Sequence, residues 1–484
     1  MTILSAGVGV AAALHYASQG LTLSHYDARG HLVVARRVID SLTPGWRQIG
    51  GVWLPLPHVL NVFPAQWDWN YRTGFSAVVL SVAFLTLGVR ALASYLIRTT
   101  ASWPIAVAIP LLILLNPNVL YLQSTPMTEA LLFGLSLMAV TSVDRWLQHD
   151  NAGQTVRTGA LLAALTLTRY EGWFIVAALC SVAGIASWRR ALVLAVFPAA
   201  AVMAFVFMSF ASTGSWLATS GFFEPNNPAL GNPRLAFSQV VEGGSLLGGS
   251  WLMWLGVAGA LGCLVAAIEA ARSTSVAKRI GVARALVPLC LAASAALPLY
   301  AFSNGHPIRI RYMTALVVAA AVAGGFALLR LPRRLHLAAA LTVVAASVSV
   351  TPPLDTTAPM VIEAQRERPS SEARRAVTAA LVAQWDGTPI MASMGSLGHY
   401  MQQMSAQGFA IKDFLHEGNG DIWTAALWGP GRFVKWILIE ETAEGGDALA
   451  NQVRVNPSFL KGFTRIAASG GVALYVRSES GSRE

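Results

Sequence analysis

The sequence predicts a polytopic α-helical membrane protein with a smaller C-terminal α/β domain, and three observations lead to that prediction. Of the 484 residues, 55% are hydrophobic and 12% are charged, whereas soluble domains carry about 25% charged residues. Apolar runs of roughly membrane-spanning length recur from Leu4 to Leu354. After this point the composition changes, because residues 355–484 hold 14 of the 24 acidic residues. A purely soluble protein is therefore excluded.

The membrane part, residues 1–354, is expected to cross the bilayer about eleven times. The spans are placed by apolar length and by Lys and Arg, which concentrate in cytoplasmic loops. The expected spans are 3–23, 74–96, 102–121, 127–147, 158–168, 173–188, 191–211, 246–270, 285–302, 312–330 and 335–353. The first is expected to be retained rather than cleaved as a signal peptide. With Met1 in the cytoplasm, the arginine-rich gaps lie inside and the C-terminal domain lies outside.

The basic balance of the chain, a net charge of +10, reflects this topology rather than a basic soluble face. No nucleic-acid partner is therefore expected. The three cysteines lie inside apolar segments, so no disulfide framework is expected. The sequence shows no P-loop, no internal repeat and no metal-type Cys/His spacing. No cofactor is expected to be required, and a divalent metal is compatible with the sequence but not indicated by it.

Spans 158–168 and 173–188 are too short for a full bilayer and meet at Arg169, Tyr170 and Glu171. Because such segments are tolerated where they line a wet cavity, a cavity at the outer side is expected. Two long outer regions, 24–73 and 214–244, are candidates for function. Within the first, residues 28–39 predict an amphipathic helix lying along the membrane surface.

The C-terminal domain, residues 355–484, alternates helix and strand patterns. A helix is expected at 363–385, buried strands at 389–392 and 434–439, and a hairpin at 463–466 with 472–476. Within this domain, His399, His416 and Glu417 are expected to be solvated surface residues.

Asp27 and His31 are candidates for acid/base chemistry. They are four residues apart, which places them on one helix face just after the first span. The alternative is that Asp27 caps the helix and that His31 is an interfacial side chain.

Glu129 and the Arg169-Tyr170-Glu171 group are also candidates. Glu129 falls in the first turn of a helix that Thr125 is expected to cap, so it is either a plain helix start or a functional carboxylate. Arg169, Tyr170 and Glu171 combine charge and aromatic character, for which function is favoured over an interfacial anchor belt.

An outer loop from Asn304 to Tyr312 carries His306, Arg309 and Arg311. The two arginines are expected to clamp a phosphate, and the alternative is binding of lipid headgroups at the interface. His58, by its own chemistry, is structural or interfacial. The candidate substrate-binding residues are His31, His58, Arg169, Tyr170, His306, Arg309 and Arg311.

Several motifs resemble those of bacterial type C glycosyltransferases, relatives of protein O-mannosyltransferases and of the lipid A aminoarabinose transferase. They are His25-Tyr26-Asp27-Ala28-Arg29-Gly30-His31-Leu32, Val52-Trp53-Leu54-Pro55-Leu56-Pro57-His58, Asn116-Pro117-Asn118, Ser124-Thr125-Pro126-Met127-Thr128-Glu129 and Thr168-Arg169-Tyr170-Glu171-Gly172-Trp173. The resemblance covers most of the membrane part.

This resemblance implies the GT-C fold in a bacterial inner membrane, a polyprenyl-phosphate-linked sugar as donor and an inverting displacement. Membrane lipids are partners, and the acceptor is a lipid, a glycan or a protein. The family's general base maps onto Asp27. Mannosyltransferases of this class carry an adjacent Asp-Glu pair there, but Ala28 follows Asp27 here, which leaves Glu129 or Glu171 as substitutes. No metal ligand is implied.

The alternative from a different class is a transporter or flippase of a lipid-linked sugar, since polar residues in a wet cavity also suit a substrate pathway. Transporters more often show repeats and polar groups near mid-membrane. Here the ionisable residues gather at the outer ends of the expected spans, which favours an enzyme.

Overall fold

The computed structural model describes residues 1–149, 151–217, 223–273, 277–366, 368–442 and 446–478. Contacts within the chain define two units. The helical unit contains Met1–Gln19, Val78–Phe205 and Phe222–Glu363, and the mixed unit contains Gly20–Ala77, Val206–Gly221 and Ala364–Glu484. By its contacts, the expected first outer loop therefore belongs with the C-terminal segment.

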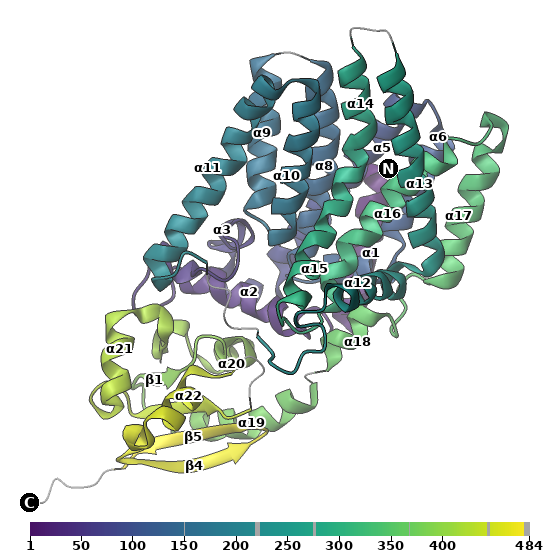
Figure 1. The fold of residues 1–484 in the computed structure, drawn as a ribbon. Coiled ribbons are helices and arrows are strands. Elements are labelled where there is room, and N and C mark those ends of the chain that lie inside the picture. Colours follow the sequence, from purple (N-terminus) through teal and green to yellow (C-terminus); the bar gives the residue numbers. More distant parts are fainter. Residues whose placement is uncertain (150, 218–222, 274–276, 367, 443–445, 479–484) are drawn as a thin grey trace, which may run out of the picture. The chain divides into compact units, whose positions relative to one another are not determined.

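The helices of the helical unit (Figure 1) include three, at 75–100, 188–213 and 359–365, that have one end in the residue ranges of the mixed unit. The helices of the unit are α1 (Thr2–Ser18), α5 (Phe75–Thr100), α6 (Trp103–Leu114), α7 (Pro117–Gln123), α8 (Glu129–Gln148), α9 (Ala152–Thr166), α10 (Tyr170–Ala186), α11 (Trp188–Thr213), α12 (Pro233–Gly248), α13 (Ser250–Arg272), α14 (Lys278–Leu286), α15 (Ala296–Ser303), α16 (Thr314–Leu328), α17 (His336–Val350) and α18 (Pro359–Gln365). A 3₁₀ segment, Val287–Ala295, joins α14 to α15.

Among the described residues, seven helices are long and apolar enough to span a membrane, and α6 with α7, bent by 67°, adds an eighth candidate. Helices lie at all eleven predicted positions, but α1, α9 and α10 fall below the length or hydropathy of a full span. The polytopic helical prediction is confirmed, whereas the count of eleven stays a prediction. In the outer region predicted at 214–244, residues 218–222 lie outside the described residues.

The helices approach each other closely where glycine replaces larger side chains. A Cβ on Gly259 of α13 would lie 1.8 Å from the carbonyl oxygen of Ala323 on α16, and one on Gly88 of α5 would lie 2.6 Å from Cα of Gly134 on α8. Backbones that approach this closely gain van der Waals contact, which holds membrane helices together where lipid offers no hydrophobic driving force.

Helix α9 begins six residues earlier than its predicted span. The side chain of Asn151 caps it by accepting a hydrogen bond from the Gln154 N–H at 2.7 Å. The Gln154 amide then donates to Thr158 at 3.1 Å. These polar residues interrupt the apolar pattern used to place spans, but their side chains are satisfied locally, so the helix continues through them.

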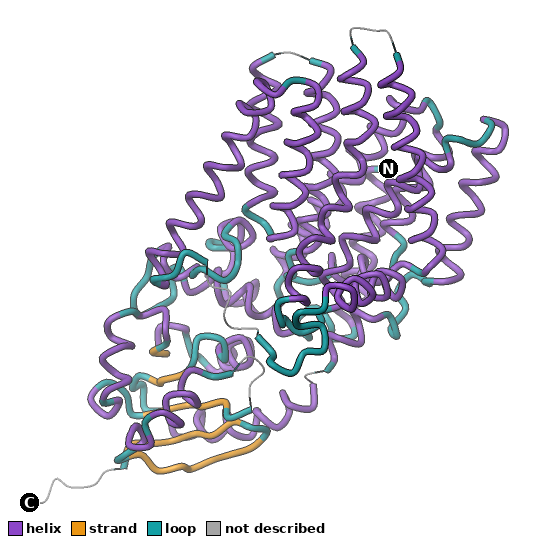
Figure 2. Tube along the Cα trace, in the orientation of Figure 1, coloured by secondary structure: helices purple, strands orange, loops and turns teal. Residues whose placement is uncertain are grey.

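The mixed unit combines short helices with a five-stranded sheet, and Figure 2 shows the strands gathered in this unit. Its helices are α2 (Tyr26–Arg37), α3 (Leu56–Asn61), α4 (Asp68–Thr73), α19 (Arg368–Gln384), α20 (Leu397–Met404), α21 (Asp421–Trp428) and α22 (Ala448–Val455). Its strands are β1 (Ile390–Ala392), β2 (Phe414–Leu415), β3 (Trp436–Glu440), β4 (Phe463–Ser469) and β5 (Val472–Arg477).

The sheet has the order β2-β1-β3-β5-β4. Strand β1 pairs in parallel with β2 and β3, and β5 pairs antiparallel with β3 and β4. The predicted strands around 390 and 436 and the predicted hairpin are therefore present. Strand β2 was not predicted, since its two residues are too few for a readable pattern.

Apolar residues cover both faces of this sheet. On one face Ile390 and Leu438 share a core with residues of α2, α19 and α20, including Leu32 and Val377. On the other face Met391, Ile437 and Ile439 pack with residues of α21 and α22. The helix predicted at 28–39 is present as α2, and ten of its twelve residues are buried in this core, which was not predicted. Its placement along a membrane surface stays a prediction. The polar side chains of α2 form hydrogen bonds and ion pairs within the unit.

Candidate functional site

Three candidate residues of the helical unit meet at the starts of α8 and α10. Nη1 of Arg169 lies 2.9 Å from Oε1 of Glu129, and Nη2 lies 2.9 Å from Oε1 of Glu171. Nε of Arg169 also donates to both Glu171 oxygens at 3.2 Å. Only 1% of Glu129 and 2% of Glu171 is exposed. The fold therefore joins a carboxylate forty positions away in sequence to the predicted Arg169–Glu171 pair.

The turn between α9 and α10 positions Arg169. Helix α9 ends at Thr166, whose carbonyl oxygen accepts from the Trp173 indole N–H at 2.8 Å. Arg169 is the residue before α10 and has an extended backbone. A Cβ on Gly172 would lie 2.5 Å from the Leu165 carbonyl oxygen, so glycine permits the tight turn here.

Helix α8 begins at Glu129, two residues later than the predicted span, with Thr128 as the preceding residue. Thr125 instead holds a turn, since its hydroxyl accepts from the Met127 N–H at 3.2 Å. The expectation that Thr125 caps the helix is therefore wrong. The Thr128 hydroxyl accepts from Nη1 of Arg169 at 2.9 Å, which fixes the guanidinium against the helix start.

The two glutamates differ in what remains available for hydrogen bonding. Both oxygens of Glu171 accept from Arg169. Neither oxygen of Glu129 has a hydrogen-bond partner in the described part of the chain, although Oε1 is within ion-pair distance of Arg169. Burial alone would lower the pKa of Arg169, but Glu129 and Glu171 raise it above its ordinary value and Arg311 opposes them. Glu129 thus keeps acceptor capacity that a ligand hydroxyl can use.

The loop after α15 carries His306, Arg309 and Arg311. Nδ1 of His306 lies 2.8 Å from the Pro307 carbonyl oxygen. Burial lowers the pKa of His306, the bond to Pro307 opposes this, and the charges of Arg309 and Arg311 lower it further. A neutral imidazole beside two arginines leaves a cationic loop, which is the chemistry that the predicted phosphate clamp requires.

Tyr170 has an aromatic environment. Its ring lies 5.2 Å from that of Trp173 and 6.3 Å from that of Phe205, both edge to face. The ring is partly exposed, so its role as a substrate-binding residue stays a prediction.

In the mixed unit, the start of α2 holds the predicted base. The His25 side chain caps the helix by accepting from the Asp27 N–H at 3.0 Å. Asp27 is therefore not the capping residue, and that alternative is wrong. It lies in the first turn, 8% exposed, where the helix dipole favours a carboxylate.

His31, one turn after Asp27, forms a chain with His58. Nδ1 of His31 lies 3.0 Å from Nε2 of His58, and Nδ1 of His58 lies 3.1 Å from the Leu54 carbonyl oxygen. Since a carbonyl only accepts, we assign the His58 proton to Nδ1, so that His31 donates to His58. Burial, with the charges of His31 and Arg37, lowers the pKa of His58 despite its bond to Leu54. His58 therefore orients His31, whose ring also lies 4.2 Å from that of Trp53.

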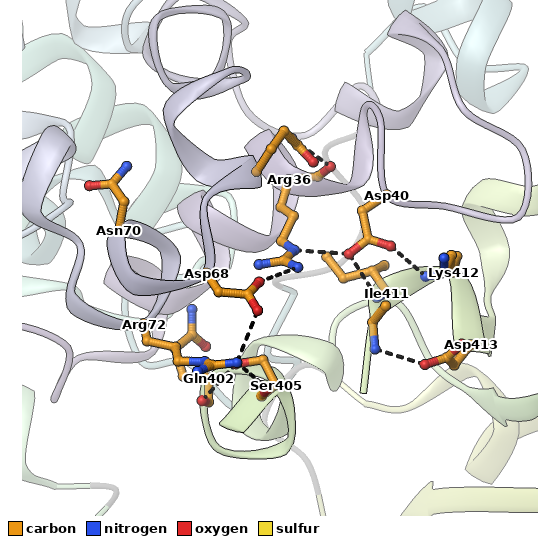
Figure 3. Close-up of polar contacts among 12 residues, drawn as sticks. Arg36, Asp40, Asp68, Asn70, Arg72, Gln402, Ser405, Ile411, Lys412 and Asp413 are labelled. Atoms are coloured by element: carbon orange, nitrogen blue, oxygen red, sulfur yellow. Dashed lines mark hydrogen bonds and ion pairs between the residues drawn. The ribbon is translucent and has the colours of Figure 1, made fainter. Parts of the chain in front are cut away.

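A second polar network holds this region together and was not predicted (Figure 3). Arg36 pairs with Asp40 at 2.8 Å and with Asp68 at 2.7 Å. Asp40 also accepts from the backbone N–H groups of Ile411 and Lys412 at 3.1 and 3.0 Å. The first-loop segment is therefore bonded to the chain before β2. These partners are 371 and 372 positions away in sequence, so no local pattern could reveal them.

The C-terminal part of the mixed unit contains buried polar residues that were expected at the surface. His416 is fully buried, and burial with the charge of Arg37 lowers its pKa to about 3. Glu417 accepts from the Ser393 hydroxyl at 2.8 Å, and burial raises its pKa although its hydrogen bonds oppose this. Nδ1 of His399 lies 2.9 Å from both oxygens of Glu440. The prediction of a solvated role is wrong for His416, whereas Glu417 is half-buried and hydrogen-bonded within the unit.

Asn116 and Asn118, which carry one of the sequence resemblances, have structural contacts. Both amide groups donate to the Leu247 carbonyl oxygen, at 2.8 and 3.0 Å. The Asn116 side chain also caps α7. These contacts tie α7 to α12 and give the motif a role in positioning helices.

Two solved structures share this fold over nearly the whole chain. One is the crystal structure of ArnT from Cupriavidus metallidurans bound to undecaprenyl phosphate, which is 13% identical, with a TM-score of 0.56, and covers 99% of this chain and 98% of that chain. The other is ArnT from the same organism in the apo state, at 14% identity, a TM-score of 0.53, and coverage of 97% and 98%. No family model and no curated protein matches the sequence.

ArnT is a lipid A aminoarabinose transferase with the type C fold. The predicted fold class, a GT-C-like membrane part with a C-terminal α/β domain, is therefore confirmed by an extended structural match despite low sequence identity.

Proposed function

We propose that this protein is an integral membrane glycosyltransferase that moves a sugar from a polyprenyl-phosphate donor to an acceptor hydroxyl, with inversion. The observation that supports this most strongly is the fold shared with ArnT over 99% of the chain. The crystal structure of that protein was obtained with undecaprenyl phosphate bound, which supports a polyprenyl phosphate as the lipid of the donor. The reaction is proposed for the outer face of the membrane, with the C-terminal domain on the same side.

In the proposed reaction, Asp27 is the general base. The acceptor oxygen forms a bond to the anomeric carbon, the bond from that carbon to the phosphate oxygen breaks, and the acceptor proton passes to the Asp27 carboxylate. The bonding pair leaves with the lipid phosphate. His31 is proposed to bind substrate at a position fixed by its hydrogen bond to His58.

The departing phosphate requires cationic donors. Arg309 and Arg311 are proposed for this role, with His306 beside them as a neutral hydrogen-bonding group. Arg169 is committed to Glu129 and Glu171, so its proposed contribution is to hold these carboxylates. Of the two candidates for a second functional carboxylate, Glu129 is the stronger, because its oxygens lack hydrogen-bond partners in the described part of the chain. Its proposed role is to accept a hydrogen bond from a sugar hydroxyl.

The test is transfer of radiolabelled sugar from a synthetic polyprenyl-phosphate donor to candidate acceptors, with the purified protein in detergent. Asp27→Asn is expected to lower turnover by about 10²–10⁴-fold, because a base of this kind contributes that much to proton transfer. Asp421→Asn is the matched control, since this exposed carboxylate is also in the first turn of a helix of the mixed unit. Normal turnover in Asp27→Asn would show that Asp27 is not the general base.

The same preparation separates the proposed enzyme from a transporter. In liposomes, a flippase would move the labelled lipid across the bilayer without forming a glycosylated product. Movement without transfer to any acceptor would contradict the proposal.

We further propose that the reaction needs no metal. On this proposal, treatment with EDTA is expected to leave the transfer rate unchanged. A loss that added Mg²⁺ or Mn²⁺ restores would overturn this part of the proposal.

A further inference from the structure

The mixed unit contains a basic cavity, lined in part by residues of α19 and α20. Its volume is about 160 Å³. The lining residues are Leu23, Arg29, Ser371, Arg374, Arg375, Thr378, His399, Tyr400, Gln402 and Gln403. Three of these ten are arginines, one is a histidine and none is acidic, so the lining favours an anion. The planar guanidinium group of arginine can donate two parallel hydrogen bonds to the oxygens of a phosphate group.

Two of the basic side chains are held in place by a carboxylate next to the cavity. Nε of Arg374 lies 2.8 Å from Oε1 of Glu440, and Nδ1 of His399 lies 2.9 Å from the same oxygen. Glu440 is 2% exposed and is itself held by the Ser396 hydroxyl at 3.1 Å. This arrangement preorganises Arg374 and His399, and Arg375 is a further cation in the lining.

Polar atoms at this cavity still require partners. Nη1 of Arg374 and both polar side-chain atoms of Gln402 are buried without a hydrogen-bond partner in the described part of the chain. Buried polar groups are nearly always satisfied by protein, water or ligand. A bound oxyanion would accept from the guanidinium and from the Gln402 amide.

An apolar groove adjoins the basic cavity. Its volume is about 300 Å³, and it shares Thr378 and Gln403 with the basic cavity. The remaining lining residues are Ala379, Val382, Ala383, Met404 and Gln407. Four of these five are apolar, so the groove suits a hydrocarbon chain attached to the anion.

We propose that α19 and α20 bind a phosphorylated amphiphile, with its phosphate group in the basic cavity and its alkyl chain in the groove. The site uses none of the residues to which sugar transfer is assigned. Binding here and the proposed transfer reaction can therefore succeed or fail independently.

Hydrogen exchange of the full-length protein in dodecyl maltoside tests the site directly. Decyl phosphate at about ten times its Kd is expected to slow exchange about tenfold in peptides covering residues 368–407, since opening of the bound site is suppressed by that factor. The maltoside already present controls for a neutral alkyl chain. Equal protection by inorganic phosphate at the same concentration would show that the alkyl chain does not contribute to binding. Absence of protection by both probes would contradict the proposed binding site.

Arg375→Glu and Ala379→Glu locate the two halves of the site. Both positions are exposed, so the fold should tolerate the changes, and unchanged exchange in β1 and β3 verifies this. Each variant is expected to lose the protection by decyl phosphate. Arg432→Glu is the matched control, because it places the same charge change at an exposed position of the mixed unit that lines neither cavity. Full protection in Arg375→Glu, or an equal loss in Arg432→Glu, would contradict the proposal.

Discussion

At the starts of α8 and α10 in the helical unit, the buried polar groups are held by ion pairs, whereas those around His58 and His416 in the mixed unit are held largely by neutral hydrogen bonds. Arg169 bridges Glu129 and Glu171. His58 instead donates to a backbone carbonyl, and His416 accepts from the Gly418 N–H at 3.1 Å. The first arrangement depends on every charge having its partner. The second depends on the imidazoles remaining unprotonated, so the two units should respond to different perturbations.

The largest expected effect is the loss of the central cation in the helical unit. Arg169→Met leaves two buried carboxylates uncompensated, which is expected to cost about 3–5 kcal/mol of stability. Thermal unfolding in detergent measures this change. Arg330→Met is the control, because the Arg330–Glu269 pair is 44% and 61% exposed and such pairs contribute about 0–1 kcal/mol. Similar destabilisation by both variants would remove the contrast between buried and exposed pairs.

Acid is expected to act on the mixed unit through its buried histidines. The unfolded chain binds a proton at His416 near pH 6.5, but the folded chain does so only near pH 3. Protons therefore favour unfolding between these values, and stability falls with decreasing pH by up to about 1.4 kcal/mol per pH unit. His58 contributes in the same direction, since its pKa is also lowered.

Hydrogen exchange of peptides covering residues 414–440, measured from pH 7 to pH 5 and corrected for intrinsic rates, reports this loss. His416→Asn keeps an acceptor for the Gly418 N–H but cannot titrate, so it should show a shallower pH dependence. An unchanged slope in that variant would show that His416 is not one of the acid-sensitive groups.

A smaller effect is expected where the mixed unit does use ion pairs. Asp40→Asn replaces one of two acceptor oxygens that bind the Ile411 and Lys412 N–H groups, which should cost about 1–3 kcal/mol. Asp68→Asn changes a carboxylate that is 51% exposed and should cost about 0–1 kcal/mol. Faster hydrogen exchange at residues 411–413 in Asp40→Asn but not in Asp68→Asn would support the distinction between the less exposed and the more exposed carboxylate. Faster exchange in Asp68→Asn alone would contradict it.

Composition and apolar length predicted the helical membrane part because lipid imposes one simple requirement on each span. The Arg169–Glu171 pair was also visible, since charges beside short apolar segments are unusual. The burial of α2 in the core of the mixed unit was not visible in the sequence, because an amphipathic pattern does not reveal what covers its polar face. The partners of Asp40, and the burial of His416, depend on segments more than 370 positions apart or on packing of the whole sheet.

The mixed unit is assembled from segments that the ribosome makes at very different times. Helix α2 is complete at Arg37, but the segment that supplies most of the rest of its core begins at Ala364. At roughly 5–20 residues per second, about 330 residues of synthesis take roughly 15–65 s. During that interval α2 emerges without Val377, Leu381 and the other residues that later bury Leu32 and Val33. Biogenesis must therefore protect this segment while the intervening helices are inserted, and a nascent chain stalled before Ala364 would expose it.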